Sequence, residues 1–366
     1  MSKPSFLVLG GVGFIGRNFV THLVENDLAS EIRVVDKALP ATSFMNARHK
    51  AAFEKVEFKQ ANLSVPASIT ASFDKEGGDF DYVINLAGET KYSQSEAIYE
   101  ERVFNLTVNC AKEAAARKVK KFIDVSTAQV YDAGKSPSDE NGKIKPWTAI
   151  ASYKYKAEQA IKQIPGLNYV ILRPAIVYGP ADISGLTPRL VVGAVYKQLG
   201  DEMKLLWTKD LLMNTVHVDD VCRAILLVCE KAPAGKIYNL ADTGATDQEK
   251  ITSLVCKIFG IKSSYHGSIV SNLAKLNLDS ATEEGNEKHL QPWSELCKAE
   301  QITSTPLSPY LDKELLSNNA LSIDGSLICK ELGFSYSHPV VTEELLRDVL
   351  RLAIETRLFP KGALSM

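Results

Sequence analysis

A strand-like apolar run that leads into three evenly spaced glycines and then a helix is the feature that most restricts how this chain can fold. In FLVLGGVGFIGRNF the glycines are Gly10, Gly13 and Gly16. The first allows a tight turn, the second lets the backbone approach a pyrophosphate, and the third permits close packing of helix on strand. The helix N-terminus adds amides and a partial positive charge for the phosphates. The loop, with Phe14 and Ile15 between its last two glycines, therefore predicts a dinucleotide site.

An acidic residue at the end of the next predicted strand supports the same site. The run EIRVVDK ends in Asp36 and Lys37, and Asp36 lies twenty residues beyond Gly16. A carboxylate at this distance can accept hydrogen bonds from the adenosine ribose hydroxyls. Because it repels a 2′-phosphate, we expect NAD rather than NADP as the cofactor, although Lys37 weakens that preference.

Short apolar runs alternate with longer amphipathic stretches through the first half of the chain. Such alternation is typical of βαβ units, whose right-handed crossovers place helices on both faces of a parallel sheet. We therefore predict an α/β fold with a doubly wound, Rossmann-type parallel sheet and a smaller C-terminal substrate lobe. The predicted strands span residues 5–10, 31–36, 56–63, 81–88, 120–127, 168–179 and 236–242.

The rhythm loosens after residue 179, which indicates where the domains divide. We predict that residues 1–178 form the NAD-binding Rossmann domain and that 212–242 add its late sheet elements. Residues 179–211 and 243–366 then form mainly the substrate lobe. Within that lobe, 263–319 is polar and contains several prolines, so we expect helices and loops there.

Composition excludes several classes of partner. Forty-two basic and 44 acidic residues give a formal net charge of −2, which predicts neither a nucleic-acid surface nor an electrostatic membrane anchor.

No run approaches the ~20 apolar residues that span a bilayer, and the N-terminus lacks a signal-peptide core. The six cysteines are scattered without a CxxC motif, so reduced thiols are expected. These features predict a soluble, cytoplasmic protein.

Six motifs, met in a fixed order along most of the chain, resemble those of a known family. They are GGVGFIG, NLAG, FNLTVN, DVSTAQVY, LRPAIVYGP and NTVHVDDVCRAI. On these motifs the chain resembles the extended short-chain dehydrogenase/reductase family, in its NAD-dependent epimerase/dehydratase-like branch. The resemblance implies a Rossmann-type domain with a smaller substrate lobe, NAD as cofactor, and a small-molecule substrate. It also implies a homodimer formed by two helices of the Rossmann domain.

The resemblance implies cofactor contacts outside the glycine loop. Asn62 and Leu63 stand where the family often has Asp-Leu against the adenine, and an amide can make a similar hydrogen bond. Ala87 and Gly88, in NLAG, lie at the strand end that passes the nicotinamide ribose. FNLTVN carries the family's helix asparagine at Asn105.

The catalytic positions implied by the resemblance are Thr127, in DVSTAQVY, and a tyrosine and a lysine four residues apart on a later helix. That spacing puts both side chains on one helix face. In the family the lysine binds the nicotinamide ribose and lowers the pKa of the tyrosine, which exchanges a proton with the substrate hydroxyl. The segment AIASYKYKAEQA contains no such pair, because the residue four before Lys154 is Ile150.

Two interpretations of this helix are open. The family's K-x-x-A-E continuation fits Lys154, which keeps the lysine and places Ile150 at the tyrosine position. The alternative pairs Tyr153 with Lys156, three residues apart. We prefer the first, since a helix does not shift by one residue without a cost in packing. Proton transfer then needs another donor, for which Tyr153 and Tyr131 are candidates.

The substrate lobe lacks two arginines that sugar-nucleotide members of the family use to grip a diphosphate. The residue four before His217 is Met213, and no arginine occurs between Arg223 and Arg347. Arg189 is the basic residue that we place near the cleft, with an exposed position on its helix as the alternative.

Three polar residues mark a predicted strand–helix junction. A buried structural hydrogen bond is the preferred role of His217, and catalysis is the alternative. Asp219 and Asp220 are expected to cap the helix, since no other metal ligands lie near them in the sequence. We therefore expect no metal site.

These observations give three hypotheses. The first is an NAD-binding oxidoreductase that acts at a secondary alcohol or ketone. In it Lys154 binds the nicotinamide ribose, Thr127 orients the substrate, and Tyr153 and Tyr131 are the candidate proton donors. The second is a catalytically silent NAD-binding scaffold or redox sensor, which the missing tyrosine favours. The third is a sugar-nucleotide epimerase or dehydratase, which has to account for Met213 and Ile150.

Overall fold

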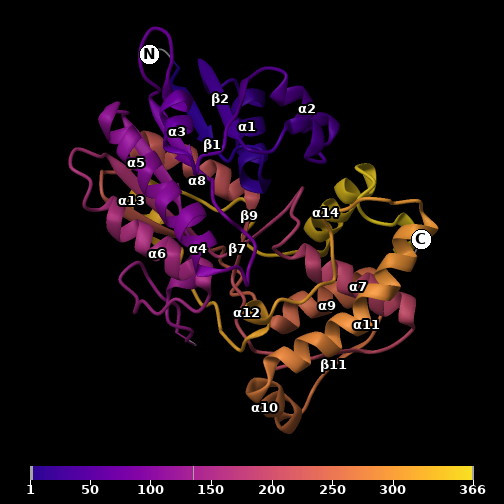
Figure 1. The fold of residues 1–366 in the computed structure, drawn as a ribbon. Helices are drawn as coiled ribbons and strands as arrows, with labels where there is room; N and C mark the ends of the chain where they lie inside the picture. The colour runs from indigo at the N-terminus through magenta and orange to yellow at the C-terminus, as the bar shows by residue number, and fades with distance from the viewer. Residues whose placement is uncertain (1–2, 135, 365–366) are drawn as a thin grey trace.

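A seven-stranded, wholly parallel sheet forms the core of the larger lobe of the computed structural model, which describes residues 3–134 and 136–364 (Figure 1). Its strands are β1 (Ser5–Leu9), β2 (Glu31–Asp36), β3 (Glu57–Gln60), β4 (Tyr82–Asn85), β5 (Lys121–Val125), β6 (Tyr169–Pro174) and β10 (Lys236–Leu240). Their order across the sheet is β10-β6-β5-β4-β1-β2-β3. The predicted doubly wound, Rossmann-type sheet is confirmed.

Both faces of the sheet are covered by helices, as the continuous apolar strands require. Along β1, Phe6 and Val8 point into one layer, whereas Leu7 and Leu9 point into the other, and all four are fully buried. The first layer contains α1 (Phe14–Glu25), α2 (Ala47–Phe53), α8 (Val218–Lys231) and α13 (Leu327–Leu332). The second contains α3 (Pro66–Phe73), α5 (Leu106–Ala116) and α6 (Ala149–Ile161).

The predicted strand over 168–179 is two strands that belong to different sheets. The register of β6 with β5 ends at Leu172, and Pro174 has no N–H to extend it. Beyond this point β7 (Ile176–Tyr178) leaves the main sheet and pairs in parallel with β9 (Thr215–His217). This change of partner carries the chain from the Rossmann layers towards the smaller lobe.

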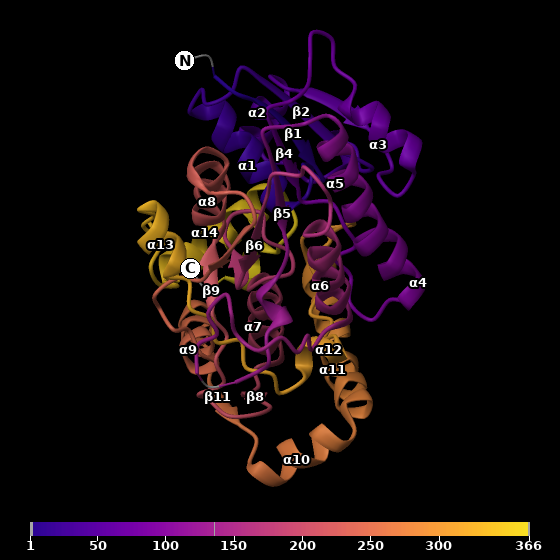
Figure 2. The same ribbon diagram turned by 90° about the vertical axis from the view of Figure 1, so that its left-hand side faces the viewer.

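The smaller lobe has a core of its own. Buried residues of α7 (Thr187–Leu199), α9 (Gln248–Phe259), α11 (Leu278–Ala299) and α14 (Glu343–Glu355) form it. A two-stranded sheet of β8 (Met203–Leu205) and β11 (Ser263–Tyr265), with α10 (Ser268–Leu276) and α12 (Lys313–Leu316), lies farther from the main sheet, with α10 at the far end (Figure 2). The polar stretch 263–319 thus contains a 22-residue helix, α11, which includes Pro292.

The remaining elements are short. They are α4 (Glu96–Tyr99), a π-helix (Glu100–Asn105) that leads into α5, and 3-10 turns at Pro40–Thr42, Ala128–Val130 and Lys361–Ala363. Among the described residues, none of the helices combines the length and apolarity that crossing a bilayer requires.

A buried ion pair ties α6 to β6. Arg173 Nε donates to Glu158 Oε1 at 3.1 Å, and both side chains are almost completely buried. Ser126 donates its hydroxyl hydrogen to the same carboxylate, and Arg173 Nη1 donates to the Tyr131 hydroxyl at 2.7 Å. This network fixes α6 against the end of β5.

Removing one partner of this pair leaves a charge buried without compensation. We expect Glu158→Gln to lower the free energy of unfolding by about 3–5 kcal/mol. Lys156→Gln, on the same helix, removes the exposed pair of Lys156 with Glu100 and is expected to cost less than about 1 kcal/mol. Urea unfolding of the two variants measures both, and equal losses would contradict the assignment.

Candidate active site

The order of the strands reverses between β1 and β4, and the glycine loop lies at that point. The crevice at the carboxyl ends of two such strands is where doubly wound sheets bind ligands. Gly10 has a φ of +74°, and a Cβ there would lie 2.6 Å from the backbone nitrogen of Ala87. A Cβ on Gly16 would meet Gly11 at 2.5 Å. Only glycine therefore fits either position, although Gly16 packs on the turn at Gly11 and not on the strand that the sequence analysis expected.

The N-terminus of α1 faces the same crevice. The helix begins at Phe14 after the N-cap Gly13, and no side chain caps it. Its first amides and the positive end of its dipole are therefore available to phosphate oxygens.

Residues from eight separate segments line one cavity of about 610 Å³ beside this loop. Asp36 lies at its edge, where Oδ2 accepts from Val12 N–H at 3.1 Å and Oδ1 accepts from Ala38 N–H at 3.0 Å. The structure thus brings together seven of the residues that the sequence assigned to the cofactor: Gly10, Gly13, Asp36, Asn62, Leu63, Ala87 and Gly88.

Two contributors to this cavity were not anticipated. Arg17, directly after the loop, donates to Val12 O at 2.7 Å and to Ser43 O at 2.8 Å. Burial lowers the pKa of Arg17 to about 10, although the negative charge of Asp36 acts to raise it. Helix α14 contributes Val349 and Leu352 from the C-terminal end of the chain. The position of Arg17 directly after the last glycine could have indicated from the sequence that it lies at the cavity. Nothing in the sequence indicated the contact with α14.

A larger cavity of about 1150 Å³ continues from the glycine loop into the space between the two lobes. It shares Gly10, Gly13 and Leu86 with the first cavity. Its walls also include Phe14, Ile15, Gly16, Thr127 and Lys154. The remaining predicted cofactor and catalytic residues, except Tyr153, therefore meet at this second cavity.

Lys154 and Thr127 hold fixed positions on its wall. Lys154 Nζ donates to Val125 O at 2.6 Å, at the carboxyl end of β5. Burial lowers the pKa of Lys154, although the nearby carboxylates of Asp124 and Glu158 oppose this. Thr127 follows β5 in extended conformation, and its Oγ1 accepts from Gln129 N–H at 3.2 Å.

Asp124 lies in the interior next to these groups. Burial raises its pKa to about 6, against the charge of Lys154 and a 2.7 Å hydrogen bond donated by Asn85 Nδ2. Near neutral pH, where it is mostly ionised, its negative charge partly balances that of Lys154.

The match to known proteins covers these same segments. Residues 6–241 match the model of the NAD dependent epimerase/dehydratase family. The chain belongs to this family. The match includes the glycine loop, Thr127, Lys154 and the junction at His217, and the family depends on NAD.

Curated members of the family have different names. The 4-hydroxy-2-methyl-3-oxo-4-farnesyl-3,4-dihydroquinoline-1-oxide ketoreductase of Stigmatella aurantiaca is 25% identical over 264 residues, which cover 70% of this chain and 73% of that protein. A dTDP-glucose 4,6-dehydratase of an Actinoplanes species is 26% identical over 275 residues, which cover 70% of this chain and 82% of that protein.

Two solved structures share the fold of this chain. WbmG of Bordetella bronchiseptica, in complex with NAD and UDP, matches with a TM-score of 0.69 and 16% identity over 98% of this chain and 97% of its own. A dTDP-glucose 4,6-dehydratase of Bacillus anthracis, in complex with NAD, has a TM-score of 0.69 and 18% identity over 96% and 97% of the two chains.

The tyrosines considered as proton donors lie away from both cavities. Ile150, which the preferred interpretation of the helix places at the family's tyrosine position, is buried with Tyr99 and Val103. Tyr153 packs on Tyr99 with ring centroids 5.8 Å apart, towards α4 and the π-helix. Tyr131 is buried, and its hydroxyl donates to Asn239 at 2.7 Å and accepts from Arg173 within the ion-pair network.

A phenol that the sequence did not single out lines the larger cavity. Tyr92, which follows the NLAG segment, lies on its wall with Thr127 and Gln129. Gln129 Nε2 donates to the Tyr92 hydroxyl at 3.2 Å, and burial raises the pKa of Tyr92. Arg189 lies on the wall as well, with its Nη2 3.1 Å from Met213 Sδ. The structure therefore places Arg189 at the cleft and not at an exposed position on its helix.

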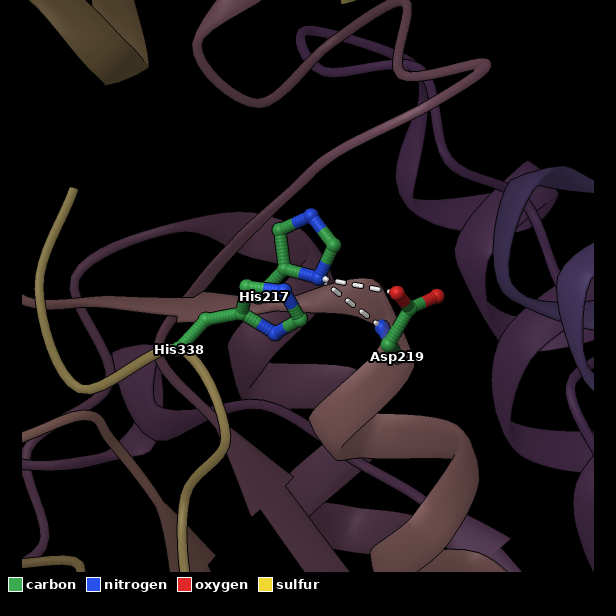
Figure 3. A group of neighbouring side chains, drawn as sticks. All are labelled: His217, Asp219 and His338. Carbon is green, nitrogen blue, oxygen red and sulfur yellow. Dashed lines mark hydrogen bonds and ion pairs between the residues drawn. The ribbon is translucent and has the colours of Figure 1, made fainter. Parts of the chain in front are cut away.

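At this junction His217 caps the helix, and not Asp219 or Asp220 as predicted (Figure 3). His217 Nδ1 accepts from Asp219 N–H at 3.3 Å, and its ring packs on that of His338 with centroids 4.0 Å apart. Potential ligand atoms of these three residues lie within 4.8 Å of one another. However, the His217 Nδ1 lone pair is already used by the cap, and the rings stack at 33° instead of converging. Burial lowers the pKa of His217 to about 4, so it is neutral at pH 7.

Asp220, beside this cap, holds a distant segment of the chain. It is fully buried and accepts from the backbone N–H groups of Ser337 and His338 at 2.8 and 2.9 Å. Its role in the described structure is to fasten the segment before α14 to the start of α8.

Asp36 gives a direct test of the cofactor cavity. Asp36→Asn keeps the size of the side chain but removes the charge that accepts from ribose hydroxyls and repels a 2′-phosphate. We expect the affinity for NAD to fall roughly ten-fold or more and the affinity for NADP to rise. Titration calorimetry with both nucleotides measures the ratio. Asp79→Asn, at an exposed loop carboxylate outside the cavity, is the control, and an unchanged ratio in Asp36→Asn would contradict the assignment.

Proposed function

We propose that this protein is an NAD-dependent oxidoreductase that acts at a secondary alcohol or ketone, with Lys154 as the group that moves the proton. The observation that carries the proposal is that Thr127 and Lys154 line one cavity that is continuous with the glycine loop. Bound NAD would accept or supply the hydride. The side chains of the protein then have two tasks, which are to hold the substrate oxygen and to exchange its proton.

Thr127 is suited to the first task. Its Oγ1 is held by Gln129 N–H, which leaves the hydroxyl hydrogen to donate to a carbonyl or alcohol oxygen in the cavity. The bond comes from the rigid end of β5, so the substrate oxygen would be held in one place.

Lys154 is better suited to the second task than the phenol of Tyr92. A proton donor works best when its pKa is near the working pH. Burial moves the pKa of Lys154 downward, towards neutral pH, whereas burial moves that of Tyr92 upward, away from it. In ketone reduction the Lys154 ammonium would give its proton to the forming alkoxide, directly or through Thr127, and regain one from solvent.

The curated relatives support chemistry of this class. One is named a ketoreductase, and a ketone is the group that this site would reduce.

Lys154→Arg separates charge from proton transfer. A guanidinium keeps the positive charge beside the cofactor cavity but does not release its proton. We expect NADH affinity to change less than three-fold and kcat with a responsive ketone to fall by about 10²–10⁴. Nicotinamide absorbance in a screen of ketones and secondary alcohols measures turnover.

Two matched variants test the choice of donor. Tyr153→Phe and Tyr92→Phe each remove one hydroxyl group, and turnover in both is expected to stay within a few-fold of wild type. A collapse of kcat in Tyr92→Phe would assign the proton to that phenol and contradict the role of Lys154.

A second candidate function is a silent NAD-binding scaffold or redox sensor. It is favoured by the burial of Ile150 with Tyr99 and Val103 and by the packing of Tyr153 on Tyr99, away from the cavity that Lys154 lines. Tight NAD binding without turnover of any alcohol, ketone or sugar nucleotide in the screen would support it over the oxidoreductase.

A further inference from the structure

The larger cavity presents a single guanidinium on a wall that is mostly apolar. Arg189, in the first turn of α7, lies partly buried on this wall. Apolar side chains from several elements surround the same space, among them Val192, Leu205, Leu211, Leu212, Met213 and Leu311. Trp207 and Tyr196 add aromatic surface.

Among the described residues, Arg189 has no acidic side chain as an ion-pair partner. Its Nη2 contacts the sulfur of Met213 at 3.1 Å, and no carboxylate of the described residues lies within ion-pair distance. By contrast, the buried Arg173 is paired with Glu158, and Arg33 with Glu57. Burial without a compensating anion is costly for a guanidinium, and it lowers the pKa of Arg189 to about 10. An anion that enters the cavity would remove this cost.

The other charged residues on the cavity wall favour an anion that carries a single negative charge. Of the lysines near its outer end, Lys288 is paired with Asp201 at 2.7 Å, and Lys204 lies near the same carboxylate. Glu202, Glu284 and Asp312 add negative charge to the lining. Apart from Lys154, whose Nζ donates to Val125 O at the end of β5, a diphosphate would meet one unpaired guanidinium and several carboxylates. A carboxylate instead matches the two-pronged geometry of a single arginine.

We infer that the substrate is a largely apolar molecule with one carboxylate, which Arg189 binds through both of its terminal nitrogens. This inference rests on the proposed function, because the same molecule would present its alcohol or ketone to Thr127 and Lys154. The apolar body would lie along the leucine-rich wall between the two ends.

Binding to the NAD-loaded protein tests the inference without turnover. The probes are octanoate, the matching alcohol octanol, and uridine diphosphate, with affinities measured by calorimetry. We expect octanoate to bind roughly ten-fold or more tightly than octanol in the wild-type protein. In Arg189→Met, whose unbranched side chain is apolar, that preference is expected to disappear while NAD affinity is kept.

Two further variants make the test specific. Arg189→Lys keeps a charge but loses the two-pronged geometry, so the preference for octanoate is expected to fall part of the way. Lys288→Met removes a paired cation of the same cavity and is expected to leave the preference unchanged. Should Arg189→Met fail to fold, the wild-type comparison and these two variants still decide the question.

Two results would overturn the inference. One is equal binding of octanoate and octanol by the wild-type protein. The other is uridine diphosphate binding more tightly than octanoate in a manner that depends on Arg189, which would indicate a nucleotide substrate. Because none of these measurements needs catalysis, a negative turnover screen would count against the proposed function alone.

Discussion

The close approach of two backbone segments at the point where the strand order reverses is the constraint on which the site depends. Gly10, after β1, lies so near Ala87, after β4, that no side chain fits between them. This contact brings the glycine loop, the N-terminus of α1 and the NLAG segment to one crevice. It also joins the cofactor cavity to the larger one, because Gly10 and Gly13 border both.

A second constraint lies beneath the cleft. The buried pair of Glu158 and Arg173 holds α6 to β6, and Ser126 joins β5 to the same carboxylate. Lys154 is one helical turn before Glu158, so the pair also sets where the Lys154 ammonium meets the end of β5. The interior is thus arranged to place a lysine with a lowered pKa beside the threonine that would hold the substrate.

Local patterns were sufficient to predict which residues would gather around the glycine loop. The glycine spacing, the strand that ends in Asp36 and the alternation of strands and helices each depend on residues close in sequence, and the structure gathers them into one cavity. The sequence could not predict that Tyr92 faces the cleft or that α14 reaches the cofactor cavity. Those contacts join elements far apart in the chain, and nothing in the local pattern of either partner encodes them. The division of 168–179 into two strands depends on a change of pairing partner, which a continuous apolar run conceals.

The central claim is that Lys154 gives the proton, and the pH dependence of the chemical step tests it most directly. Single-turnover reduction of a responsive ketone at saturating concentration, by protein already loaded with NADH, removes the binding of both reactants from the measurement. A donor must be protonated to act, so the account predicts a rate that falls as pH rises through a pKa below the 10.5 of an ordinary lysine. A rate that stays constant up to that pH would contradict the account.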